Sequence, residues 1–200
     1  MSGQRHFIRR TYIETGGGIN LSYFDVGGGS PGLSIGGSVL FDLHPQWRLG
    51  PNVGFHRTSG IDEGTPNANR EYAYRSNLNE ISIKGVFVIR FKQYPLKKWK
   101  RKLEPRIFAS MGILQVQSLQ NQNLSGNSSD DKLSIAPVFS IGLGLAYAIK
   151  SDFLLALEGA SNFSTSDFLE GYTNLNFSTS RDMFHSMLLK IIYKLPIQTI

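Results

Sequence analysis

Apolar and polar residues alternate with a period of two through much of this chain, and this alternation limits the possible fold more than any other feature. It is clearest between residues 133 and 149, where odd positions carry mostly Leu, Ile, Phe and Tyr, and even positions carry Ser, Ala, Gly and Val. A period of two places successive side chains on opposite faces of a β-strand. The stretch is too short and too rich in small residues for a membrane-spanning helix, and Pro137 interrupts it. We therefore predict a strand with one bulky apolar face.

The same alternation recurs along the chain, always with the bulky apolar residues at odd positions. Eight segments show it: 11–24, 31–44, 47–59, 76–93, 103–118, 133–149, 153–166 and 182–195. Short links at 44–46, 94–102 and 149–152 alternate with longer polar links at 60–76, 119–132 and 167–181, and the link 25–31 is the shortest of the second set. Short turns at one end and long loops at the other are typical of outer-membrane barrels. The fold class predicted for residues 1–200 is all-β, a single domain forming an eight-stranded antiparallel transmembrane β-barrel with up-and-down topology.

A soluble barrel with its apolar face turned inward would alternate in the same way, but three features favour the membrane. The bulky apolar side chains are too numerous for the interior of eight strands, and the small residues of the other face fit it better. Several runs are longer than soluble strands usually are. Aromatic residues of the apolar face also gather at the short-turn end, as in an interfacial girdle. These are Phe41, Trp47, Phe91, Tyr147, Phe153 and Tyr193.

If odd positions face lipid, the even positions place five acidic and five basic side chains in the lumen. Buried charges persist only when they are paired, so we predict an ion network that plugs the barrel. The residues are Glu14, Asp42, Glu80, Glu104 and Glu158 with Arg48, Lys84, Arg90, Arg106 and Lys190.

The net charge of +6 is concentrated in one link. Basic proteins often bind nucleic acid, but no recognition helix or basic helical stripe accompanies this charge, so we expect no nucleic-acid partner. Two interpretations remain: a solvated turn near anionic headgroups, or a docking site in which Trp99 is an anchor among cations. The candidate partner-binding residues are Lys97, Lys98, Trp99, Lys100, Arg101 and Lys102.

The sequence offers little for catalysis or cofactor binding. It contains no cysteine, and its four histidines lack metal-ligand spacing, so we expect no metal and no cofactor. His56 is expected to be a hydrogen-bonding residue of the lumen. His185 and Ser186, with Asp167 and Asp182 nearby, could suggest acyl transfer by a lipid-modifying barrel. Adjacent strand residues point to opposite faces, however, so these two cannot easily share a proton. We therefore expect that the protein is not an enzyme.

The first residues carry charges but lack the apolar core of 7–15 residues that defines a signal peptide. We expect that an export signal was removed ahead of this numbering and that the protein resides in the bacterial outer membrane.

Several segments of the second half resemble a known family. They are Asn79–Phe87, Glu104–Gly112, Phe139–Ile149 and Leu155–Tyr172, and with the last strand they cover most of residues 76–195. The chain resembles PorG-type barrels, the small outer-membrane component of the Bacteroidetes type IX secretion apparatus. One departure is that barrels of this kind usually end in an aromatic residue, whereas Tyr193 is followed by further residues here. The resemblance implies a non-enzymatic role, docking a periplasmic lipoprotein of the secretion machine to the membrane. The alternatives are a free-standing OmpX- or OmpA-like barrel that binds external ligands through its loops, and a lipid-modifying enzyme.

Overall fold

The computed structural model describes residues 10–23, 28–61, 73–89, 102–121, 129–164 and 182–195. Nine strands lie within them. They are β1 (Thr11–Tyr23), β2 (Gly28–Ser30), β3 (Gly32–His44), β4 (Trp47–Ile61), β5 (Ala73–Val88), β6 (Leu103–Asn121), β7 (Ser129–Ala148), β8 (Phe153–Ser164) and β9 (Met183–Lys194). No helix in these ranges is long and apolar enough to span a bilayer.

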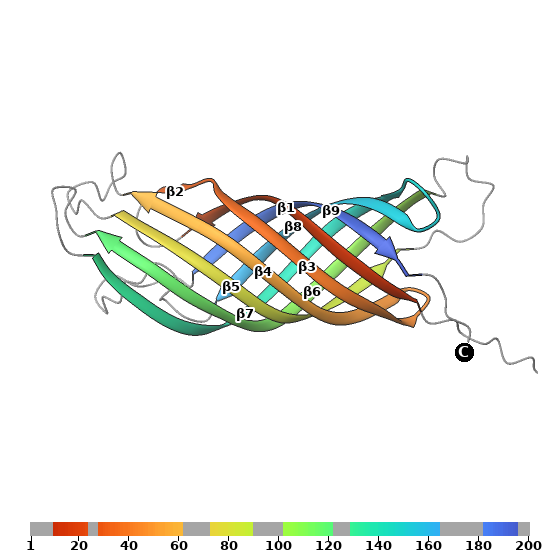
Figure 1. Cartoon of the computed structure of the whole chain (residues 1–200), viewed down its shortest axis with the longest axis horizontal. Helices are drawn as coiled ribbons and strands as arrows, with labels where there is room; N and C mark the ends of the chain where they lie inside the picture. Colours follow the sequence, from red (N-terminus) through yellow and green to blue (C-terminus); the bar gives the residue numbers. More distant parts are fainter. Residues whose placement is uncertain are drawn as a thin grey trace, which may run out of the picture.

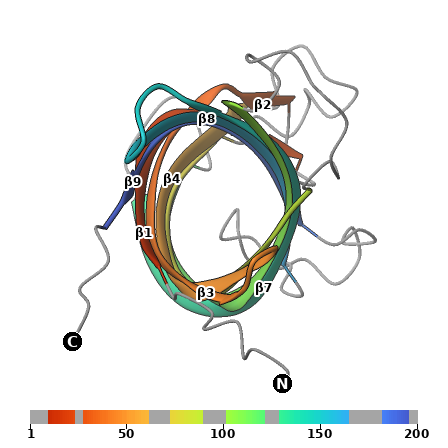
Figure 2. The same cartoon turned by 90° about the vertical axis from the view of Figure 1, so that its right-hand side faces the viewer.

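The long strands close into a ring (Figures 1 and 2). Each pairs antiparallel with its neighbours in the order β4-β3-β1-β9-β8-β7-β6-β5, and pairing of β5 with β4 completes the circle. The first and last long strands meet along their length, from Tyr12 opposite Lys194 to Tyr23 opposite Met183. Closure satisfies the backbone hydrogen bonds of every wall strand, which a sheet surrounded by lipid requires. The predicted eight-stranded meander is confirmed.

The short strand β2 is not one of the eight strands that form the barrel wall. Its three residues pair with the end of β4, opposite Ser59 to Ile61, and Pro31 separates it from β3. Proline has no N–H to give to a ladder, so the strand is interrupted there and resumes at Gly32. The expected segment 31–44 therefore corresponds to β3, preceded by a short extension toward the loops.

Side chains face outward at odd positions and inward at even positions in every long strand. Ile83, Leu143 and Ile191 are exposed, whereas Ser34, Arg106 and Phe184 are buried. A soluble barrel would place the bulky apolar face inside, so that alternative is wrong. An apolar outer wall is stable only against hydrocarbon.

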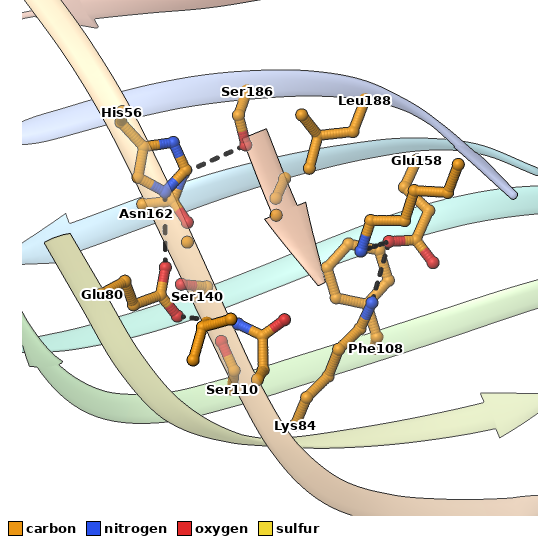
Figure 3. Close-up of a pocket in the computed structure, with 16 residues that line it drawn as sticks. His56, Glu80, Lys84, Phe108, Ser110, Ser140, Glu158, Asn162, Ser186 and Leu188 are labelled. Carbon is orange, nitrogen blue, oxygen red and sulfur yellow. Dashed lines mark hydrogen bonds and ion pairs between the residues drawn. The ribbon is translucent and has the colours of Figure 1, made fainter. Parts of the chain in front are cut away.

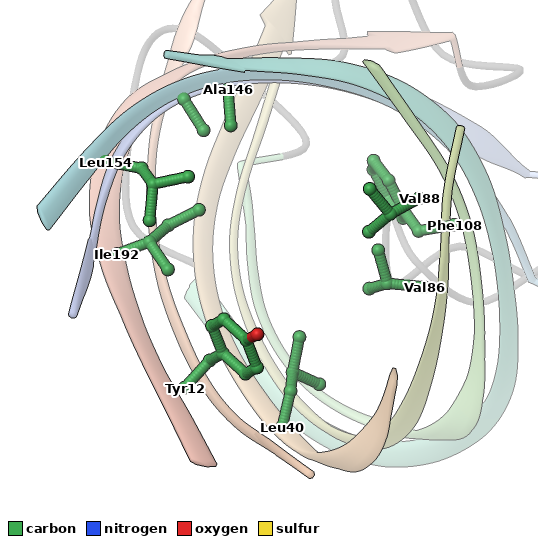
Figure 4. Close-up of a cluster of buried hydrophobic side chains, with 9 residues drawn as sticks. Tyr12, Leu40, Val86, Val88, Phe108, Ala146, Leu154 and Ile192 are labelled. Carbon is green, nitrogen blue, oxygen red and sulfur yellow. The ribbon is translucent and has the colours of Figure 1, made fainter. Parts of the chain in front are cut away.

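The lumen is filled rather than open. At the short-turn end a cluster of apolar side chains points inward from around the ring (Figure 4). Its buried members are Tyr12, Leu40, Val86, Val88, Phe108, Ala146, Leu154, Ala156 and Ile192. A second cluster lies toward the long loops, with Leu78, Leu114, Val116, Val138 and Phe184. Between these two apolar layers lies a central group of charged side chains.

The expected aromatic girdle is present at the short-turn end. Phe41, Trp47, Tyr147 and Phe153 are all between 41% and 52% exposed on the outer wall. The Trp47 ring lies 4.8 Å from that of Phe87, and the Phe153 ring lies 4.8 Å from that of Tyr193. Phe91 lies outside the described residues. Aromatic rings at this height are typical of a membrane–water interface.

Candidate functional site: a plugged lumen and its surfaces

The centre of the lumen holds five charged side chains from five strands. Arg106 Nη1 donates to Glu14 Oε1 at 2.7 Å and to Glu158 Oε1 at 3.2 Å. Lys84 Nζ donates to Glu158 Oε2 at 2.8 Å and to Glu14 Oε2 at 3.4 Å. Lys190 Nζ lies 2.8 Å from Glu158 Oε2. All five side chains are at most 3% exposed, so their charges are compensated by one another rather than by water.

Small residues on the lumen side make room for this network. A Cβ added to Gly144 would lie 2.9 Å from Glu158 Cγ and 3.0 Å from Arg106 Cγ. One added to Gly16 would overlap the backbone oxygen of Leu189 and lie 2.7 Å from Lys190 Cγ. Gly144, and in part Gly16, therefore admit long charged side chains where eight strands leave little space.

A second group of charges lies at the short-turn end of the lumen. Arg48 Nη2 donates to Glu104 Oε2 at 3.3 Å, and Arg48 Nε lies 3.4 Å from Asp42 Oδ1. The Arg48 guanidinium carbon lies 3.8 Å from the centroid of the Tyr12 ring, close enough for a cation–π interaction. Lys194 Nζ donates to Glu104 Oε1 at 3.5 Å.

A third polar group lies on the loop side of the central network (Figure 3). His56 Nε2 is 3.6 Å from Glu80 Oε2, and His56 Nδ1 shares a 2.7 Å hydrogen bond with Ser34 Oγ. Asn52 Nδ2 donates to Glu80 Oε1 at 3.2 Å. A cavity of about 40 Å³ separates this group from Lys84, Glu158 and Lys190, room for only a few water molecules.

The predicted lumen network is thus confirmed for nine of its ten residues, and His56 is the expected hydrogen-bonding residue. Arg90 lies outside the described residues. Sequence reasoning missed Lys194, although its even number already predicted an inward side chain. Within the described ranges no three His, Cys, Asp or Glu residues are grouped so that they could hold a metal ion.

The two faces of β9 separate the pair that suggested acyl transfer. Ser186 is 8% exposed inside the barrel, whereas His185 occupies the outer face, as its odd position predicts. The partner of His185 comes from the neighbouring strand: Ser161 Oγ lies 2.9 Å from His185 Nδ1. Sequence spacing could not reveal this contact, because it depends on the pairing of β8 with β9. Asp167 lies outside the described residues, and Asp182 is buried.

Of the candidate partner-binding residues, only Lys102 is described. It is exposed beside the start of β6, and its Nζ lies 5.8 Å from the centroid of the Tyr147 ring. Lys97, Lys98, Trp99, Lys100 and Arg101 lie outside the described residues, so docking by this segment stays a prediction.

Comparison with known proteins identifies the fold but not the activity. No family model matches the chain, and no curated protein matches it in sequence. Among solved structures it is similar to Neisserial surface protein A, with a TM-score of 0.60 and 12% identity over 92% of this chain and 97% of that one. A major outer membrane protein from Thermus thermophilus gives a TM-score of 0.57 at 11% identity, covering 94% of this chain and 100% of that one.

The attachment invasion locus protein Ail of Yersinia pestis, solved with the heparin analogue sucrose octasulfate, gives a TM-score of 0.53 at 11% identity over 94% of this chain and 100% of that one. At such identities the likeness concerns the fold alone. The closed ring, the apolar outer wall and the aromatic girdle agree with it. The chain has the fold of an eight-stranded bacterial outer-membrane β-barrel, and location in the outer membrane fits this fold.

Proposed function

We propose that this barrel is a non-enzymatic anchor that docks a periplasmic component of a protein secretion machine of the type IX kind. The observation that carries the proposal is the filled lumen. Among the described residues, a central network of five buried charges lies between two apolar layers and borders a cavity of about 40 Å³. Because these side chains occupy the centre of the lumen, we place the function at the outer surfaces and ends of the barrel.

The short-turn end supports the docking role. β1 begins and β9 ends at this end (Figure 2), which the general arrangement of outer-membrane barrels assigns to the periplasm. β5 ends and β6 begins at the same end, the basic segment 97–102 connects them in sequence, and Lys102 lies beside Tyr147 of the aromatic girdle. Lysines combined with Trp99 offer a periplasmic lipoprotein both charge complementarity and an aromatic anchor.

The docking variant replaces Lys97, Lys98, Lys100 and Lys102 with Gln and Trp99 with Ala. We expect it to fold and reach the outer membrane, because these residues fall between β5 and β6 in sequence and in neither strand, but to lose co-purification with its periplasmic partner and secretion through the machine. The matched control replaces Arg10 and Lys150 with Gln. Both are exposed cations at the same end, so the control retains binding if the segment, rather than basic charge in general, is recognised.

If the docking variant still captures the same proteins and supports normal secretion, segment 97–102 is not the docking site. If the control and the docking variant lose binding equally, the basic end acts only through attraction to anionic headgroups.

A free-standing barrel that binds external ligands is the second candidate, and the opposite end favours it. β6 and β7 remain paired as far as Asn121 and Ser129. Among the described residues, pairing of β7 with β8 extends only from Val138 to Ala148. The β6–β7 hairpin therefore extends beyond β8 on the loop side, and β5 extends with it on its other side, so this part of the wall can present a binding surface outside the cell.

The two candidate functions predict different results in intact cells. Replacing residues 122–128 with a two-residue turn should leave secretion and periplasmic co-purification unchanged if docking is the function. If the barrel binds external ligands instead, this loop variant should abolish capture of a fluorescent sulfated glycan such as heparin by the cells, while the docking variant captures it normally.

A further inference from the structure

The lipid-facing wall carries a groove that spans β6 to β9. Its volume is about 600 Å³, within the range of ligand pockets. The outward residues that line it are Ile107, Ile141, Leu143, Gly159, Ser161 and His185. A Cβ added to Gly159 would meet no atom within 4 Å, so packing within the wall does not require glycine there. The absent side chain keeps the groove open instead.

The depth of the groove follows from strand register. Ile141, Ser161 and His185 form one row across β7, β8 and β9. The next outward row toward the loops holds Phe139 and Phe163, which are 47% and 39% exposed. Outward aromatic residues at this level are typical of the outer interface. The Ser161–His185 row of the groove therefore lies just inside the outer interface, where acyl chains join lipid headgroups through esters, and the rest of the groove extends from there toward the short-turn end.

The polar row contains an ordered pair of side chains. Ser161 Oγ and His185 Nδ1 are 2.9 Å apart, and adjacent strands hold both residues. Polar groups that face hydrocarbon are costly unless they are hydrogen-bonded. When the imidazole Nδ1–H donates to Ser161 Oγ, the Ser161 hydroxyl can donate to an acceptor in the groove.

We propose that this groove binds an ester-linked acyl chain of an outer-leaflet lipid. The chain lies against Ile107, Ile141 and Leu143, in the space that Gly159 leaves open. The ester carbonyl accepts a hydrogen bond from the Ser161 hydroxyl, which His185 orients. Acyl chains surround this part of the wall in the membrane. The hydrogen bond from the Ser161 hydroxyl holds one of these lipids more tightly than the lipids that make only apolar contacts. The site is independent of the docking end, on the opposite side of the membrane.

The test uses the full chain refolded in detergent and native mass spectrometry. The probes are a diester phosphatidylethanolamine and its diether analogue, which lacks the carbonyl groups. A hydrogen bond of ordinary net strength corresponds to roughly threefold to tenfold in affinity, so wild-type protein should retain the diester lipid better by about that factor. Ser161→Ala should bring its retention down to the diether level, and Ser161→Thr, which keeps a hydroxyl, should restore the preference. Gly159→Leu should reduce retention of both lipids.

Matched controls are outward residues of β1 on other parts of the wall. Thr15→Ala and Gly17→Leu should leave retention of both lipids unchanged, because Gly17 is exposed and an added Cβ would make only ordinary contacts. Heat-modified gel mobility verifies that each variant is folded.

Three results would overturn the proposal. The first is equal retention of the diester and diether lipids by wild-type protein. The second is a dimer that Gly159→Leu dissociates, because a second copy of the chain would then cover the groove. The third is release of lysophosphatidylethanolamine, since Ser161 would then attack the ester instead of binding it.

Discussion

Arg106 shows at the scale of one residue how the barrel keeps charge away from water. Its side chain is 1% exposed and lies between Glu14 and Glu158, with Nη1 2.7 Å and 3.2 Å from their carboxylate oxygens. Both carboxylates also meet Lys84, at 3.4 Å and 2.8 Å. A buried ion pair contributes little net stability when it is intact, because desolvation offsets the attraction, but losing one partner leaves an uncompensated buried charge.

Arg106→Met should therefore lower the free energy of unfolding by about 3–5 kcal/mol. Its matched control is Lys194→Met, which removes a cation that is 15% exposed and 3.5 Å from Glu104. We expect the control to cost about 1 kcal/mol or less, as for more hydrated pairs. Urea unfolding in phospholipid vesicles, followed by tryptophan fluorescence, measures both. Equal losses for the two variants would mean that the central network is not the main charged contribution to stability.

At the scale of a strand, height in the membrane determines what each outward residue contributes. On β5, Ile83 lies midway between Phe87, in the girdle, and Asn79, which pairs with the outward Phe55 of β4. Ile135 of β7 lies four residues beyond Phe139 toward the loops. Both isoleucines are exposed on the outer wall, at 58% and 70%, yet only Ile83 lies near the bilayer midplane.

Ile83→Arg should cost about 2–4 kcal/mol, and Ile135→Arg only about 0–1 kcal/mol, because the cost of charge on the lipid face falls toward the interface. Both variants replace an outward isoleucine with arginine, so they differ in the depth of the residue in the membrane. Unfolding free energies in vesicles provide the measurement. A larger loss for Ile135→Arg would mean that the membrane band lies closer to the long loops than the girdle indicates.

At the scale of the whole molecule, the barrel is a plugged cylinder with two unlike ends. Apolar layers lie near both ends of the lumen, the central ion network lies between them, and a second group of ion pairs lies at the short-turn end. The short-turn end carries the aromatic girdle, the start of β1 and the end of β9, and at the other end the β6–β7 hairpin extends beyond β8. Such a molecule can anchor, dock or bind at its surfaces, and the side chains described in its interior favour a closed lumen.

We expect planar-bilayer recordings of the purified protein to show no steady single-channel steps. The physical reason is the interior of an eight-stranded barrel, which side chains alone can fill. A sixteen-stranded porin inserted under the same conditions is the positive control. Reproducible conductance of porin size would contradict the plugged lumen and favour a transport function.

Sequence alone determined the features that depend on local periodicity. Because side chains alternate with a strict period of two, the strand count, the orientation of each residue and the set of charges in the lumen could all be predicted from residue numbers. Ser186 was correctly separated from His185 on this ground. The predicted ends were less accurate, as β6 and β7 extend further toward the loops than expected, because polar residues beyond the membrane no longer alternate in hydrophobicity.

The tertiary structure decided which residues meet. Glu14 and Arg106 are on strands distant in sequence, and they pair only because the ring closes and its register brings them across the lumen. Lys194 meets Glu104, and Ser161 meets His185, for the same reason. Alternation fixes the face on which a side chain lies but says nothing of its height relative to another strand. That height is set by register around the closed barrel, which no single segment encodes.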